Sequence, residues 1–156
     1  MKVSAAAFTL FAAVPAQAAF NPVEFFRGRS DGQGTLKVIF RSPERIQTDN
    51  LGRSENDGSL VLQQVIREPG KPPRTRYWRL RQTAPGRFEG TLTDAAGPVR
   101  VDVAKDGIRI RYTAQNHLNF DQLLTPVSAT EVHDLIRVKR FGITVARFDE
   151  TIHKLD

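Results

Sequence analysis

The chain has 156 residues, of which 40% are hydrophobic, and its 23 Lys and Arg against 17 Asp and Glu give a formal net charge of +6. This size and composition suit one globular domain and exclude a polytopic membrane protein and a disordered tail. The chain has no cysteine, which excludes a disulfide, a thiolate nucleophile and a thiolate metal site.

The first 18 residues have the pattern of a cleaved signal peptide. Lys2 supplies a positive charge, an apolar run covers residues 3–14, and Ala16-Gln17-Ala18 is a small-x-small cleavage signal. The run is shorter than the roughly 20 residues of a membrane-spanning helix, so no transmembrane span is expected. Residues 1–18 are therefore interpreted as a signal peptide and residues 19–156 as one domain, with a periplasmic or secreted location.

Export argues against a nucleic-acid partner, because nucleic acid is scarce outside the cytoplasm and the cationic residues are spread along the chain. A solvated basic surface is the simplest interpretation of the net charge. Peripheral contact with the anionic surfaces of the cell envelope is the alternative. The sequence leaves the oligomeric state open.

One short helix is expected at the start of the domain. Asn21 is a suitable N-cap, Pro22 occupies the first helical position, and Glu24 follows the cap by three residues. The glycines that begin at Gly28 end the pattern, so the helix covers only a turn or two over residues 22–26.

From residue 35 onward the hydrophobic pattern has a period of two, which indicates β-strands. Apolar and polar residues alternate cleanly over residues 35–41, 87–93, 99–103 and 108–113. Less regular strands are expected over residues 44–50, 59–68, 74–82 and 131–140. Residues 143–153 have β-branched side chains on both faces, which indicates a bulge or a strand covered on both sides.

About nine or ten short strands joined by tight turns predict an antiparallel meander. A long meander exposes two edges unless it closes into a barrel, which removes both. The low apolar content also favours a single-layer barrel over a two-sheet sandwich, which remains the alternative. The expected fold is all-β: an antiparallel up-and-down β-barrel with a short N-terminal helix and room inside for one small ligand.

Four different short motifs are spread along the domain: Phe25-Phe26-Arg27-Gly28 with Gly32 and Gly34, Arg76-Tyr77-Trp78-Arg79-Leu80, Phe88-Glu89-Gly90 with Gly97, and Lys139-Arg140-Phe141-Gly142-Ile143. Through them the chain resembles the bacterial family catalogued as domain of unknown function 3833. The resemblance implies a calycin-like (lipocalin-like) barrel without an established activity. Many family members are envelope lipoproteins with a lipidated cysteine, so this cysteine-free chain is expected to be a soluble periplasmic form.

Residues that carry catalytic chemistry are scarce. His117, His133 and His153 lack the spacing of metal ligands, and no serine lies in a nucleophile elbow. Asp149 and Glu150 are neighbours in a strand and face opposite sides, so both are interpreted as surface residues rather than an acid–base pair. The protein is therefore not expected to be an enzyme, and no catalytic residue, metal or cofactor is expected.

The best candidate for a site is the interior of the barrel. In the strand at residues 74–82, the alternation that buries Trp78 also turns Arg76 inward, while Phe88 and Tyr112 lie on the apolar faces of their own strands. These side chains would bind a hydrophobic or acidic amphiphilic small molecule, such as a fatty acid, because arginine pairs with a carboxylate.

The alternative assigns these residues to structure alone. Arg76 then packs across Trp78 or extends out at the rim, and the barrel is filled by its own side chains. Such a protein would be a non-catalytic structural or interaction protein of the cell envelope.

Overall fold

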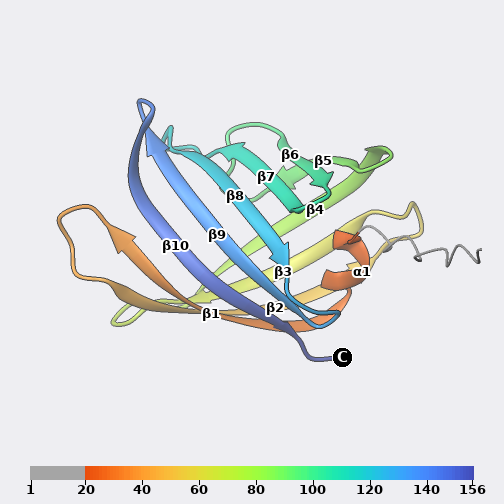
Figure 1. Ribbon diagram of the computed structural model, residues 1–156, viewed down its shortest axis with the longest axis horizontal. Helices are drawn as coiled ribbons and strands as arrows, with labels where there is room; N and C mark the ends of the chain where they lie inside the picture. The colour runs from red at the N-terminus through yellow and green to blue at the C-terminus, as the bar shows by residue number, and fades with distance from the viewer. Residues whose placement is uncertain (1–19) are drawn as a thin grey trace, which may run out of the picture.

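The computed structural model describes residues 20–156, so the signal peptide predicted for residues 1–18 lies outside the described residues. One short helix, α1 (Pro22–Phe26), precedes ten strands: β1 (Gly28–Val38), β2 (Glu44–Ser54), β3 (Leu60–Arg67), β4 (Arg74–Ala84), β5 (Arg87–Leu92), β6 (Val99–Ala104), β7 (Gly107–Thr113), β8 (Asn119–Pro126), β9 (Glu131–Arg140) and β10 (Ile143–Lys154). Each strand pairs with its sequence neighbour, and β1 pairs antiparallel with β10 (Figure 1). The predicted up-and-down closed barrel is confirmed, and the sandwich alternative is wrong.

The predicted N-terminal helix is also confirmed, and it covers one end of the barrel. The Asn21 carboxamide oxygen accepts the N-cap hydrogen bond from the Val23 amide at 2.9 Å. The Phe26 carbonyl lies so close to Gly52 of β2 that a side chain there would collide with it. The Lys154 ammonium of β10 donates to the carbonyl groups that end the helix. Among residues 20–156, no helix is long and apolar enough to cross a membrane.

The two ends of the barrel differ in what covers them. At the end near α1, called the helix end here, β2 ends, β3 begins and the chain terminates (Figure 1). At the opposite end, called the loop end, lie the β1–β2 and β3–β4 loops and the β9–β10 turn (Figure 1). The interior is therefore bounded by a packed helix on one side and by loops on the other.

The apolar core follows the alternation seen in the sequence. Inward side chains of successive strands form one buried cluster in contact with Phe25 of α1. Its most deeply buried apolar members are Leu60, Val99, Val101, Ile108, Leu124 and Val132. Several of these residues lie where their strands begin or end near α1, so the tightest packing is toward the helix end.

Two strand segments were not predicted. β8 alternates, but its inward position Gln122 is a buried polar residue between Phe120 and Leu124, so the apolar signal is interrupted. β1 begins at Gly28 rather than near residue 35, because its first half is composed of small and polar residues. Of the two alternatives for residues 143–153, a bulge or a strand covered on both sides, the bulge is confirmed by a register shift between Thr144 and Ala146.

Candidate functional site

Two neighbouring cavities lie inside the barrel and share part of their lining. The larger, of about 120 Å³, is lined from β1 to β4 and from β7 to β10, and it extends to the loop end at Arg74. The smaller, of about 40 Å³, is lined on the helix end by Pro22 and Phe26 of α1. Trp78 and Asp134 line both cavities, so these side chains mark the boundary between the two.

Arg76 lies on the wall of the larger cavity, as its position in β4 predicts. Its side chain is 13% exposed. The guanidinium donates from Nε to Asp94 Oδ1 at 3.0 Å and from Nη2 to the Tyr112 hydroxyl at 2.9 Å. Its central carbon is 5.4 Å from the Trp78 ring centroid and 5.9 Å from that of Tyr112. A positive charge is therefore fixed between two aromatic rings.

Aromatic rings form one side of the cavity. Trp78 and Tyr112 meet edge to face with centroids 5.8 Å apart, and Tyr112 stacks on Phe120 at 4.7 Å. The Trp78 indole donates to Gln64 Oε1 at 3.3 Å. Burial raises the pKa of the Tyr112 hydroxyl, with the Arg76 charge acting in the opposite direction. This wall offers flat apolar contact surface with a few fixed polar atoms.

The structure brings together three of the four residues predicted for the site. Arg76, Trp78 and Tyr112 all line the larger cavity. Phe88 does not: it is buried in the apolar core and lines neither interior cavity. The alternation of β5 correctly predicted that Phe88 faces inward, but its side chain packs within the apolar core. We therefore remove Phe88 from the candidate site.

The sequence interpretation missed two carboxylates in the cavity wall. Asp134 of β9 and Glu150 of β10 are 1% and 2% exposed, and the two residues are direct partners in the β9–β10 ladder. Directly opposed side chains have Cβ atoms about 5 Å apart. The interpretation of Glu150 as a surface residue is thus wrong, whereas its neighbour Asp149 is exposed and contacts His133.

These carboxylates are only partly hydrogen-bonded. Thr48 Oγ1 donates to Glu150 Oε1 at 2.6 Å, and Gln122 Nε2 donates to Asp134 Oδ2 at 2.6 Å. Asp134 Oδ1 has no hydrogen-bond partner among the described residues. Burial raises the pKa of Glu150 to about 7. Burial and the nearby Glu150 carboxylate raise the pKa of Asp134 well above its usual range.

Two further polar side chains lie inside the barrel, on the neighbouring strands β1 and β2. Ser30 and Asn50 are buried, and within the part of the chain described here their side-chain polar atoms have no partner. A sequence signal could have revealed these buried polar side chains: polar residues at the inward positions of a strand. In β2, Thr48 and Asn50 follow Ile46 at such positions. Among residues 20–156, no group of three or more His, Cys, Asp or Glu side chains is placed to hold a metal ion.

Together these groups form a cavity with polar groups of both signs and an aromatic wall. Arg76 supplies hydrogen-bond donors with a positive charge, whereas Asp134 and Glu150 supply acceptors that become negative on losing their protons. Such a cavity can orient a small molecule that has an apolar body and polar groups.

Solved structures of very different sequence share this fold. The S-type phycobiliprotein lyase CPES from Guillardia theta matches with a TM-score of 0.70 and 7% identity, over 86% of this chain and 90% of the lyase. Rv2717c from M. tuberculosis matches with a TM-score of 0.66 and 16% identity, over 87% of this chain and 99% of that protein. At these identities the likeness shows the fold alone, which is that of a calycin-like barrel.

No curated protein matches the sequence significantly. A family model does: the one described as "Protein of unknown function (DUF3833)" matches residues 4–154, which is nearly the whole chain. The match agrees with the resemblance carried by the glycine and aromatic motifs, and the structure supplies the barrel that the resemblance implies. The chain therefore belongs to the DUF3833 family of proteins of unknown function.

Proposed function

We propose that this protein is an exported, non-catalytic binding module that holds a small amphiphilic molecule with an acidic group inside its barrel. The observation that supports the proposal is the largely buried Arg76 guanidinium on the cavity wall. A guanidinium has several N–H donors, and only two bonds from Arg76 are made to described residues. Donors therefore remain for the carboxylate of a ligand, which arginine binds in a bidentate manner.

The charges around the entrance also suit an acidic group. Arg74 lines the cavity at the loop end and pairs with Glu68 at 3.2 Å, while Lys71 pairs with the same carboxylate. Lys71 lowers the pKa of Glu68, so this carboxylate is ionised and its charge is already neutralised. The entrance has three cations and two carboxylates. The cations are those of Lys71, Arg74 and Arg76, and the carboxylates are those of Glu68 and Asp94.

The cavity volume restricts the size of the ligand. About 120 Å³ is well below the roughly 300–1,000 Å³ of pockets for drug-sized molecules. A short- or medium-chain acid therefore suits the site better than a long fatty acid. Its apolar body would lie against Trp78, Tyr112 and Phe120.

Titration with octanoate, followed by the fluorescence of Trp78, tests this proposal. Trp78 is the only tryptophan, so the signal comes from the cavity wall alone. Replacing Arg76 by alanine should weaken octanoate binding about tenfold to a hundredfold, because a charge-assisted pair contributes roughly 1.5–3 kcal/mol. The matched control is Arg79→Ala, on the same strand but 53% exposed on the outer face, which should leave the affinity unchanged.

Affinity rather than melting temperature is the decisive measurement here. Arg76→Ala also removes the bonds to Asp94 and Tyr112, so some loss of stability is expected whether or not a ligand binds. If the wild-type protein shows no fluorescence change up to about 100 μM octanoate, equivalent to binding weaker than roughly −5.5 kcal/mol, the proposal fails for this ligand class.

A second candidate function is supported by the outer face of the barrel. Lys37 of β1, Arg147 of β10 and Arg137 of β9 are direct neighbours across adjacent strands. Like charges in this arrangement repel each other, and none of the three forms an ion pair with a described residue. The exposed aromatic rings Phe40 and Phe141 lie in the loops next to these strands, both with positive φ. This surface suits peripheral contact with an anionic envelope membrane.

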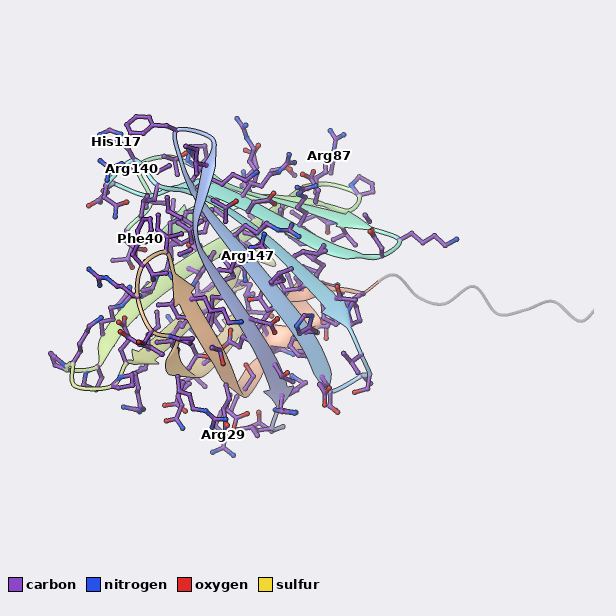
Figure 2. The ribbon with its side chains drawn as sticks, turned by 60° about the vertical axis from the view of Figure 1, so that its left-hand side comes forward. Arg29, Phe40, Arg87, His117, Arg140 and Arg147 are labelled. Atoms are coloured by element: carbon purple, nitrogen blue, oxygen red, sulfur yellow. The ribbon has the colours of Figure 1, made fainter. Side chains whose placement is uncertain are left out.

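Sedimentation with lipid vesicles tests this candidate. Wild-type protein should bind phosphatidylglycerol vesicles and not phosphatidylcholine vesicles. Arg147→Glu should weaken that binding at least about tenfold, since a basic residue contributes about 1 kcal/mol near an anionic surface and the reversed charge adds repulsion. Arg87→Glu, which changes another exposed arginine far from Arg147 (Figure 2), is the control. Equal binding to both vesicle types, or equal loss in both variants, would exclude the membrane surface as partner.

A further inference from the structure

We propose that Asp134 and Glu150 form a second polar subsite in the cavity that Arg76 lines, and that this subsite binds the ammonium group of a ligand. This inference rests on the proposed function, because it identifies the other end of the same small molecule. The ligand class is then a zwitterion with an acidic group near Arg76, a short apolar body, and an amine at its far end.

The first support is the position of the two carboxylates. They are opposed across β9 and β10, both face inward, and both line the cavity that Arg76 and Trp78 line. Opposed like charges destabilise a sheet, and a buried carboxylate costs free energy that an apolar residue would not. An apolar pair at these positions would fill the barrel without that cost, whereas a cation bound by the carboxylates would offset it.

The second support is the hydrogen-bond inventory of the pair. Asp134 is fully buried and lines both cavities, and its Oδ1 has no partner among the described residues. Thr48 occupies one oxygen of Glu150, and Gln122 occupies the other oxygen of Asp134. Acceptors therefore remain on both carboxylates, and an ammonium group has three donors to give.

The third support is the way in which neighbouring strands make room for Glu150. Gly32 of β1 lies beneath the carboxylate: a Cβ there would collide with Glu150 Oε1 and Thr48 Oγ1. Because Gly32 has no side chain, the Glu150 carboxylate can lie against β1 and accept the hydrogen bond from Thr48. Two elements, β1 and β2, thus hold the carboxylate in the cavity.

Three probes with six carbons each separate the two ends of the site: hexanoate, hexylamine and ω-aminohexanoate, each titrated against wild-type protein by Trp78 fluorescence. The zwitterion should bind at least about tenfold more tightly than hexanoate, because it adds a charge-assisted interaction. Glu150→Gln and Asp134→Asn keep the side-chain size, and each should remove this advantage of the zwitterion over hexanoate. Asp149→Asn, on the outer face of the same strand, is the matched control.

The pH dependence of the wild-type protein provides a test that needs no variant. Glu150 faces Asp134 on β9, Thr48 on β2 and Gly32 on β1; the other ionisable groups lining the cavity are Arg76, Tyr112, Glu68 and Arg74. An ammonium group needs ionised carboxylates, so hexylamine affinity should rise about tenfold from pH 5.5 to pH 8. Hexanoate affinity should not rise over this range.

The outcomes distinguish the two proposals. If hexanoate binds but the zwitterion binds no better, and hexylamine affinity does not change with pH, the ammonium subsite is excluded and the acidic-ligand proposal stands. If hexylamine binds with the expected pH dependence and hexanoate does not bind at all, the Arg76 proposal fails on its own. If no probe binds, both are wrong.

Discussion

The free energy of unfolding of the wild-type protein is expected to fall by about 3 kcal/mol as the pH rises from about 4.5 to about 7. Glu150 has a pKa of about 7 in the folded barrel and 4.5 as its ordinary value. Between these values the unfolded chain releases this proton while the folded chain retains it, so ionisation favours unfolding. A difference of about 2.5 pKa units, at 1.36 kcal/mol each, gives the stated magnitude.

Other carboxylates act in the opposite direction, but at lower pH. Hydrogen bonds and nearby cations lower the pKa of Asp57, Glu68, Asp121 and Asp156, so their contributions are lost only below about pH 4. Asp134, whose pKa is raised, adds to the loss that Glu150 causes. The protein should therefore be most stable near pH 4–5, which is more acidic than the optimum of most proteins.

Urea unfolding at a series of pH values, followed by circular dichroism, measures this dependence directly. Glu150→Gln should flatten the curve between pH 4.5 and 7 and should make the variant more stable than the wild type at pH 8. Glu89→Gln, the same substitution at an exposed position of β5, should leave the wild-type curve unchanged. A wild-type protein whose stability rises steadily up to pH 7 would show that Glu150 is not buried with a raised pKa.

The part of the candidate site formed by Arg76 and Trp78 could be predicted from the sequence, because both residues lie in one strand. The two residues are two positions apart in β4, so alternation alone turns both inward. Tyr112 follows in the same way from the apolar positions of β7. Their mutual contacts depend on closure of the barrel, which the meander pattern also predicted.

The carboxylate pair could not be predicted in this way, because it depends on the register between two strands. Glu150 faces Asp134 only through the pairing of β9 with β10, and a slip of one residue would turn a side chain to the outer face. The bulge at Thr144 and Ala146 shifts that register. Apolar residues on both faces of β10 also removed the alternation that would have marked Glu150 as inward.

Residues in and around the candidate site also hid β8 and the first half of β1 from the sequence pattern. At Gly34 of β1 a Cβ would collide with the Phe148 ring, just as a side chain at Gly32 would collide with Glu150. These positions must lack side chains, so the first half of β1 has no apolar alternation. In β8 the inward Gln122, which bonds Asp134, interrupts the apolar series. The residues around the candidate site thus interrupt the regular pattern at the same places.

Replacing Tyr112 by alanine is expected to lower the free energy of unfolding by about 3–5 kcal/mol, the usual cost of deleting a buried aromatic side chain. Tyr112 is 6% exposed, stacks on Phe120, meets Trp78 edge to face and accepts a hydrogen bond from Arg76. The chain provides its own control, since its only other tyrosine, Tyr77, is 54% exposed on the outer face of β4.

Tyr77→Ala should change stability by no more than about 0.5 kcal/mol, as is usual at exposed positions. Tyr112→Phe keeps the ring and removes only the hydroxyl, so its cost should be about 1–3 kcal/mol because Arg76 then lacks that acceptor. Urea unfolding of the three variants gives these values. If the ring packing and the hydroxyl both stabilise the wall of the cavity, Tyr112→Ala is the least stable variant, Tyr112→Phe is intermediate and Tyr77→Ala is the most stable. Equal stability of the Tyr112→Ala and Tyr77→Ala variants would mean that Tyr112 is not enclosed by Trp78, Phe120 and Arg76, and the aromatic wall of the binding site would then have to be abandoned.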